Sequence, residues 1–275
     1  MNLSDTLSGE TILPEASDDP LNLSAACVCG RGKIRSNNED NFLFDEQCLP
    51  EQHIGLEEPA LMRRVLRSGE YMAVFDGMGG GDYGEAASYI AASLLKQETE
   101  YPLPTDDIAD GSLKVLCRQM NQAVFDQREL RMCGQMGTTA AIVYFTECTA
   151  WVCNIGDSRV FRLRYGTLEQ VSRDHTDEQM MRELGITGRK PYLTQFLGMD
   201  PEEHYIVPAI TALELERGDV YLLCSDGLTD MVPRPDMERI MSQNKNASDC
   251  AQALLEAALR GGGRDNITAI VCNLE

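Results

Sequence analysis

Short apolar runs that stop at glycine or aspartate are the most regular pattern along the chain. The runs at residues 71–75, 220–224 and 267–271 are almost wholly apolar, which predicts buried strands. Three further segments are rich in β-branched and aromatic residues and are separated only by short turns, at residues 138–145, 150–155 and 159–165. Such spacing predicts an antiparallel meander.

Helical spacing of apolar residues marks residues 85–95, 113–130 and 247–259. The longest of the three has its apolar residues near one face: Val115, Leu116, Met120, Val124 and Phe125. We expect the first two helices to pack side by side. Residues 60–66 predict a short helix or a turn, and the glycines of residues 77–81 predict a break in regular structure.

Strands and helices occur in runs rather than in strict alternation. This order favours antiparallel sheets covered by helices, an α/β fold of the α+β type. The 275 residues fit one large domain or two small ones, and we expect one. Because residues 1–20 lack sustained periodicity, we expect a flexible N-terminal extension and then a single domain over residues 21–275.

The chain is strongly acidic, with 44 Asp and Glu against 24 Lys and Arg and a formal net charge of -20. Such a charge repels nucleic-acid phosphates and anionic membranes, so we expect neither as a partner. Acidity alone usually serves solubility, and a cation-binding role needs evidence from position. The ten scattered cysteines and the absence of a recognisable leader lead us to expect reduced thiols in a cytoplasmic protein. Cys27 and Cys29 would share one face of a strand, where core packing is commoner than a zinc site.

Acidic residues recur where apolar runs begin or end, next to glycine or asparagine. They are Asp40, Asp76, Asp157, Asp226 and Asp265. A single Asp-Gly pair most often belongs to a turn. Several carboxylates held rigidly at strand ends would instead repel one another unless a hard cation such as Mg²⁺ or Mn²⁺ were present.

Six motifs resemble, in order, those of the type 2C metal-dependent protein phosphatases. They are RSNNEDN at residues 35–41, DGMGG at 76–80, GTT at 137–139, GDSR at 156–159, SDGLTD at 225–230 and GRDN at 263–266. The resemblance runs from about Ala25 to Cys272 and is greatest to the standalone bacterial members. It implies a four-layer sandwich of two central antiparallel β-sheets flanked by α-helices.

The resemblance also implies a role for each matching residue. Asp76 would bridge two divalent cations, Mg²⁺ or Mn²⁺. The Glu39 carboxylate and the Gly77 carbonyl would bind one ion, and Asp226 and Asp265 would bind the other. All are hard oxygen ligands, as these ions prefer.

Supporting positions follow from the same resemblance. Asp40 would act mainly through a metal-bound water, Asn266 would support the neighbouring site, and Arg35 would hold the substrate phosphate. A water activated by the two cations would attack phosphorus in line. Bacterial members can hold a third ion, for which the matching positions are Asp157 and Asp230, with Asp226 shared between sites. A turn aspartate is an equally good interpretation of Asp157.

Two features of the chain bear on the leaving group and the substrate. Many eukaryotic relatives have a histidine where this chain has Met78, and methionine cannot protonate the leaving alkoxide. The proton would then come from a metal-bound water or another group. His175 is a candidate, although a surface histidine beside an acid is the commoner explanation. Residues 176–197 lie where the family carries a mobile flap. Its basic residues are Arg182, Arg189 and Lys190. They would either meet acidic phosphoproteins or only face solvent.

The resemblance therefore implies a protein phosphatase that hydrolyses phosphoserine and phosphothreonine through a metal-activated water. We expect phosphorylated proteins as substrates, a cognate bacterial serine/threonine kinase that it opposes, and a monomer. A non-catalytic relative that keeps the fold as a binding module is one alternative, but such proteins usually lose metal aspartates that are intact here. A phosphatase of small phosphoesters is another, and only competing substrates separate it.

Overall fold

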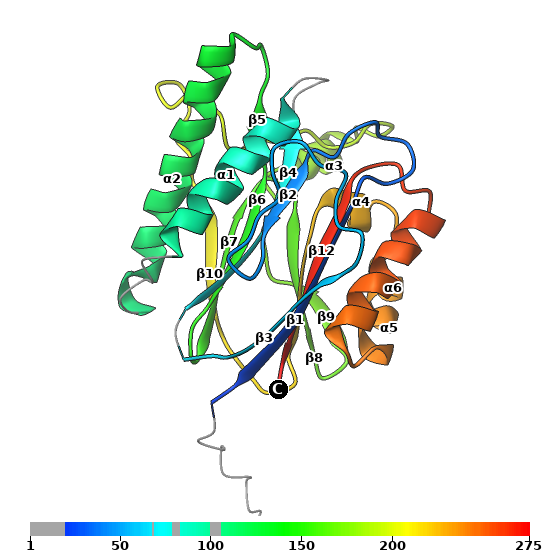
Figure 1. Ribbon diagram of the computed structural model, residues 1–275. Coiled ribbons are helices and arrows are strands. Elements are labelled where there is room, and N and C mark those ends of the chain that lie inside the picture. The colour runs from blue at the N-terminus through cyan, green and yellow to red at the C-terminus, as the bar shows by residue number, and fades with distance from the viewer. Residues whose placement is uncertain (1–19, 68, 79–82, 100–105) are drawn as a thin grey trace, which may run out of the picture.

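Two antiparallel sheets pack face to face in the centre of the molecule, and helices cover the outer surface of each (Figure 1). The structure is a computed structural model that describes residues 20–67, 69–78, 83–99 and 106–275. The expected four-layer sandwich is confirmed. The predicted N-terminal extension, apart from Pro20, lies outside the described residues.

The first sheet has the strand order β3-β1-β12-β11-β8-β9. Its strands are β1 (Asn22–Gly30), β3 (Ala60–Val65), β8 (Arg159–Arg164), β9 (Thr167–Gln170), β11 (Val220–Cys224) and β12 (Ile267–Leu274). Alternate side chains of β1 serve two cores, because successive residues of a strand point to opposite faces. Cys27 and Cys29 face the other sheet, whereas Ala26 and Val28 face the helices. Core packing is therefore the observed role of the two cysteines.

The second sheet has the order β10-β7-β6-β4-β2, and a short strand β5 pairs with β4. Its strands are β2 (Asp40–Leu43), β4 (Glu70–Met78), β5 (Gly137–Thr138), β6 (Ala140–Phe145), β7 (Thr149–Ile155) and β10 (Ala209–Glu214). The apolar run predicted at residues 71–75 forms the buried centre of β4. Between the sheets, the rings of Phe145 and Tyr221 meet edge to face with centroids 5.3 Å apart.

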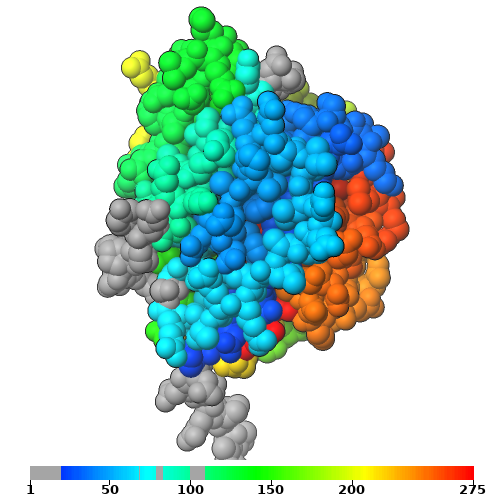
Figure 2. Space-filling model, viewed as in Figure 1, coloured from blue at the N-terminus to red at the C-terminus, as the bar shows by residue number. Residues whose placement is uncertain are grey.

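Helices flank the two sheets on opposite sides (Figure 1). They are α1 (Gly84–Glu98), α2 (Asp106–Arg131), α3 (Glu178–Leu184), α4 (Asp226–Thr229), α5 (Arg234–Gln243) and α6 (Ala247–Arg260). The pair α1 and α2 packs on the second sheet, and α5 and α6 pack on the first. The three predicted helices are confirmed as α1, α2 and α6, although Val115 is 50% exposed rather than inward. In Figure 2 the blue and cyan residues of the N-terminal strands and their connections fill the centre of one face between the two helical layers.

Residues 60–66, predicted as a short helix or a turn, instead contain the edge strand β3. The strand pairs antiparallel with β1 and places Ala60 opposite Cys27. Met62 is buried, whereas Leu61 is 63% exposed. The apolar residues of this short run fit either periodicity, and the available partner β1 decides the outcome.

The predicted meander is wrong in its third strand. Strands β6 and β7 pair as expected, but β8 pairs with β11 in the other sheet. The connection from β7 to β8 turns at Gly156, whose φ of 95° is a conformation that glycine tolerates best. The chain thus changes sheets at this turn, and the change carries Asp157 to the end of the sandwich where the other acidic motifs lie.

Strand β4 continues through the first part of the expected glycine break. Gly77 lies in the strand and pairs with Thr138 of β5. A Cβ at Gly77 would lie 2.2 Å from the carbonyl oxygen of Gly84, so only glycine permits this approach of the α1 N-terminus. The remainder of the break, residues 79–81, is outside the described residues.

Candidate active site

An open cavity of about 640 Å³ lies at one end of the sandwich. Five carboxylates line it: Glu39, Asp76, Asp157, Asp226 and Asp265. Two cationic side chains, Arg35 and Lys190, also line it. The strand-end acids singled out from the sequence are therefore gathered in one place, with Asp40 directly behind them.

Asp40 and Asp76 face each other across two neighbouring strands. Asp40 is the first residue of β2 and pairs in register with Asp76 near the end of β4. The backbone of Asp76 is fixed by Thr139, whose hydroxyl accepts from the Asp76 N–H at 3.0 Å and whose N–H donates to the Asp76 carbonyl at 2.9 Å. Sheet pairing thus holds both carboxylates in place before any ligand arrives.

Asp40 is the most deeply buried acid of the group, at 1% exposed. Its Oδ2 accepts hydrogen bonds from the hydroxyls of Ser225 at 2.7 Å and Thr268 at 2.8 Å. Its Oδ1 is buried and has no hydrogen-bond partner among the described residues. Burial raises the pKa of Asp40 to about 7, although the two hydroxyls oppose the shift. A buried acceptor without a partner is costly, which indicates that a water or an ion completes this site.

The other carboxylates repel one another across the cavity. Burial, and then the charges of Asp226 and Asp40, raise the pKa of Asp76 well above its usual range. Burial and Asp226 raise the pKa of Asp157 to about 6. Burial also raises the pKa of Asp226, even though the neighbouring Lys190 favours the ionised form. Cations at this site would relieve the repulsion and restore the charged carboxylates.

Local structure explains where the remaining acids lie. Asp226 begins α4 two residues after the end of β11, and Asp265 lies two residues before the start of β12. The loop that carries Glu39 is held by Asn266, whose Oδ1 accepts from the Glu39 N–H at 2.8 Å and whose amide donates to the carbonyls of Arg31 and Asn37. Asn266 therefore ties the Glu39 loop to the start of β12.

Arg35 lies at the cavity mouth with its side chain 44% exposed. One guanidinium nitrogen, Nη2, donates to Asp265 Oδ2 at 2.7 Å, and Nη1 is 3.9 Å from Glu39 Oε2. The guanidinium thus lies beside two of the carboxylates, and its remaining N–H groups are available to bind an incoming anion.

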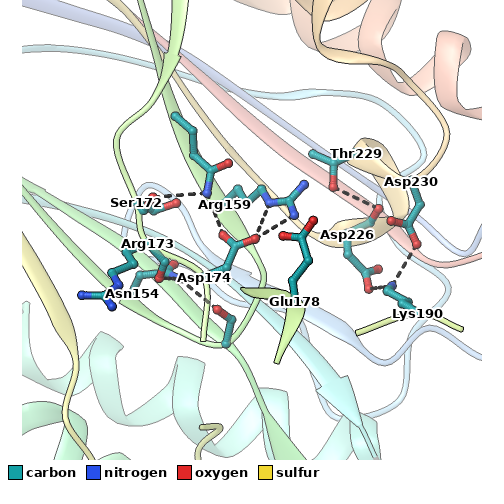
Figure 3. Close-up of polar contacts among 12 residues, drawn as sticks. Asn154, Arg159, Ser172, Arg173, Asp174, Glu178, Lys190, Asp226, Thr229 and Asp230 are labelled. Atoms are coloured by element: carbon teal, nitrogen blue, oxygen red, sulfur yellow. Dashed lines mark hydrogen bonds and ion pairs between the residues drawn. The ribbon is translucent and has the colours of Figure 1, made fainter. Parts of the chain in front are cut away.

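Lys190 contacts two other carboxylates, Asp226 and Asp230. Its Nζ donates to Asp230 Oδ2 at 2.8 Å and also to Asp226 Oδ2 (Figure 3). The 176–197 segment that carries it consists of α3 and irregular chain, in agreement with its weak strand pattern. The basic residues of this segment differ in position: Lys190 lines the cavity, whereas Arg189 pairs with Asp177 and Arg182 with Glu178.

His175 does not line the cavity formed by the described residues. Its Nδ1 accepts a hydrogen bond from the Gly156 N–H at 3.3 Å, and burial together with Arg173 lowers its pKa. A neutral ring used in this way anchors the flap to the β7–β8 turn. Met78 does line the cavity, so the position occupied by histidine in many relatives offers no proton here.

Sequence motifs alone did not assign roles to four polar side chains that shape the site: Thr139, Ser225, Thr268 and Lys190. Thr139 and Ser225 belong to motifs noted from the sequence, so adjacency was a usable signal. Thr268 lies within an apolar strand, and nothing local indicates that its hydroxyl reaches Asp40.

The donor set suits hard divalent cations. It combines several carboxylates with Asp40 Oδ1, which has no hydrogen-bond partner among the described residues. Gly77 lies against the backbone of the Glu39 loop, and its N–H donates to the Glu39 carbonyl at 3.1 Å. Among the described residues, no three of the acidic side chains are arranged closely enough to bind one metal ion together. Arg35 and Lys190 instead hold Asp265, Asp226 and Asp230 in ion pairs.

Comparison with known proteins gives one consistent family. The model described as "Protein phosphatase 2C" matches residues 60–260. The serine/threonine phosphatase stp of Listeria welshimeri is 32% identical over 260 residues, which cover 88% of this chain and 92% of that protein. No helix of the described residues has the length and apolar character needed to cross a membrane.

Solved structures agree. The Mycobacterium tuberculosis serine/threonine phosphatase PstP/Ppp superposes with a TM-score of 0.76 at 31% identity, covering 93% of this chain and 100% of that chain. A second structure is titled as the catalytic domain of PstP in complex with two manganese ions, and it gives a TM-score of 0.75 at 31% identity over 92% of this chain and 99% of that chain. The chain therefore belongs to the protein phosphatase 2C family and is a metal-dependent serine/threonine protein phosphatase.

Proposed function

We propose that the cavity binds two divalent cations, Mg²⁺ or Mn²⁺, through a defined set of oxygens. Asp76 would contact both ions, with Glu39 and the Gly77 carbonyl on one side and Asp226 and Asp265 on the other. The single observation that carries this proposal is the gathering of these acids around one cavity with raised carboxylate pKa values. The two manganese ions named for the PstP catalytic domain support it.

The bound cations would supply the positive charge that lowers the pKa of a water and neutralises phosphoryl oxygens. Asp40 would accept a hydrogen bond from a water through Oδ1, the oxygen without a partner. Arg35 would bind the substrate phosphate after releasing Asp265, since its guanidinium lies at the cavity mouth. Asn266 would keep the Glu39 loop in register with β12. Because Met78 has no proton to give, the proton for the departing serine or threonine oxygen would come from a water or from another group at the cavity.

Phosphorylated proteins are the proposed substrates, and a serine/threonine kinase is the proposed opposing enzyme. The open cavity supports this choice, because it leaves room for a phosphorylated segment of a protein. A cytoplasmic location is proposed with it. We also propose residues 21–275 as one catalytic domain, since β1 near its beginning pairs with β12 at its end in the first sheet.

Phosphate release from a phosphothreonine peptide tests the proposed ligands. The wild-type chain with Mn²⁺ should release phosphate, whereas chelation or Asp76→Asn should each reduce kcat by about 10²- to 10³-fold, because a lost charge-stabilising group costs roughly this much. Phosphate can be followed continuously by a coupled assay. Activity that survives both treatments would rule out a metal site centred on Asp76.

A matched acidic variant controls for general charge loss. Asp219→Asn also removes one carboxylate, but Asp219 lies outside the cavity, so kcat of the folded fraction should stay near the wild-type value.

Competition between the peptide and a small aryl phosphate would separate a protein phosphatase from an enzyme indifferent to peptide context.

A further inference from the structure

Lys190 extends from the 176–197 flap to the edge of the acidic cavity. Its ammonium group lies between Asp226 and Asp230, with which it makes two ion pairs (Figure 3). The side chain is 50% exposed, whereas the side chain of Asp226 is 16% exposed. The contact therefore brings a cation from the surface to the edge of the acidic cluster, where charges are screened less than in open solvent.

The backbone on both sides of Lys190 is fixed. Asp177 accepts from the Tyr192 N–H at 2.7 Å, donates its own N–H to the Tyr192 carbonyl at 3.0 Å, and pairs with Arg189 at 2.5 Å. The Arg189 guanidinium also stacks over the Tyr192 ring at 4.0 Å from its centroid. A short clamped turn thus presents Lys190 to the cavity, and the two ion pairs join this turn as a unit to Asp226 and Asp230.

Lys190 and a third divalent cation would compete for the same Oδ2 atoms of Asp226 and Asp230, whereas Lys190 leaves Asp226 Oδ1 to one of the two ions proposed above. Asp157 is close enough for the Lys190 charge to favour its ionised form. These three acids are the group that the sequence resemblance associates with a third ion, so an internal cation already compensates their charge.

We propose that Lys190 takes the place of a third metal ion at Asp226 and Asp230 and thereby ties the 176–197 flap across the cleft. A divalent ion binding at this pair has to displace the ammonium, which releases the flap. The inference rests on the proposed metal ligands, of which Asp226 is one. Lys190 is a positioning residue in this scheme, and Arg35 keeps the role of phosphate anchor.

Titration of the metal-free full chain with Mn²⁺ by calorimetry tests the proposal. Wild type should bind two ions, with a third only weakly. Lys190→Met keeps the length of the side chain but removes its charge, so the third ion should bind about tenfold more tightly, which corresponds to about 1.4 kcal/mol. Lys190→Arg should resemble wild type, as should Lys245→Met, which alters an exposed lysine outside the cavity.

Hydrogen exchange of the flap gives a second readout that is independent of activity. Metal-free Lys190→Met should exchange faster than wild type over residues 185–192, and Asp230→Asn should do the same without gaining a third ion. Unchanged third-ion affinity in Lys190→Met, in a variant whose melting curve shows that it is folded, would overturn the proposal. Failure of wild type to bind two ions would instead contradict the proposed function, and Lys190 would then have no metal to replace.

Discussion

Strand β11 carries an acidic group at each end, and the two groups are compensated in opposite ways. Asp219 precedes the strand and is 1% exposed. Both of its carboxylate oxygens accept from Arg164 at 2.6 Å, and Oδ2 also accepts from the Glu216 N–H at 3.1 Å. Arg164 in turn pairs with Glu216 at 2.5 Å. The Asp219 carboxylate is therefore satisfied by partners within the chain.

At the other end of β11, Asp226 faces a cavity in which five carboxylates meet two cations. Burial and mutual repulsion raise several carboxylate pKa values, and Asp40 keeps one buried oxygen without a partner. A buried aspartate therefore stabilises the fold where an arginine of the chain pairs with it. Where the chain supplies too few cationic and hydrogen-bonding partners, it is available to bind a ligand. The two ends of β11 differ in local charge balance and not in burial, since each end contains a buried carboxylate.

Arg164→Met would break the compensated end and gives the largest expected change in stability. Removal of the guanidinium leaves Asp219 charged and buried without its partner, so the free energy of unfolding should fall by about 3 kcal/mol. Urea denaturation followed by circular dichroism measures the loss. The kcat of the folded enzyme should be unchanged, because Arg164 is outside the cavity. A variant that keeps its stability but loses kcat would reverse the assignment of the two ends.

Arg35→Lys would sharpen the comparison at the cavity end. The Arg164 guanidinium donates hydrogen bonds to several acceptors within the chain. Arg35 makes one close hydrogen bond with the described residues, to Asp265. Lysine keeps the positive charge but loses the fork that binds a phosphate through two parallel hydrogen bonds. We expect kcat/KM for a phosphothreonine peptide to fall by about 10- to 100-fold, or roughly 1.4–2.7 kcal/mol.

Steady-state kinetics at saturating Mn²⁺ measure the effect of Arg35→Lys. Thermal unfolding should shift little, because the side chain is 44% exposed and exposed ion pairs contribute little to stability. A large loss of stability with unchanged kcat/KM would show that Arg35, like Arg164, serves the fold.

Local periodicity was sufficient for the helices and the buried strands. The helices predicted at residues 85–95, 113–130 and 247–259 are present, because an amphipathic stripe reports burial directly. Local periodicity did not predict strand β3, nor that the chain passes to the other sheet before β8. Both depend on which distant strand is available for pairing. Local pattern carries no information of that kind.

The candidate site shows the same division. The acids were predictable because each one stands at the junction of an apolar run and a glycine or asparagine, and the ordered motifs linked them. The hydroxyl of Thr268 and the ammonium of Lys190 were not assigned to Asp40 and Asp226, because their partners are distant in sequence and each contact depends on how a side chain crosses the fold. Sequence thus indicated the charge to be compensated but not the groups that compensate it.

The pH dependence of the metal-free protein tests the uncompensated end. A carboxyl group whose pKa is higher in the folded chain binds more protons when folded, so stability falls as pH rises between the unfolded and the folded values. The unfolded value for Asp is about 3.9. The folded values are about 6 for Asp157 and about 7 for Asp40. With chelator present, the melting temperature should therefore fall between about pH 5.5 and pH 8, by roughly 5 °C for about 2 kcal/mol.

Saturating Mg²⁺ should abolish or reverse this slope, because cations favour the ionised carboxylates and bind only the folded chain. Differential scanning fluorimetry across the pH range, with and without Mg²⁺, measures both curves. Asp40→Asn should flatten the metal-free curve, since it removes the group with the higher of the two folded pKa values, whereas Asp219→Asn should lower the whole curve by removing the partner of Arg164. A metal-free chain that is more stable at pH 8 than at pH 5.5 would mean that internal partners compensate the cavity acids as fully as Arg164 compensates Asp219.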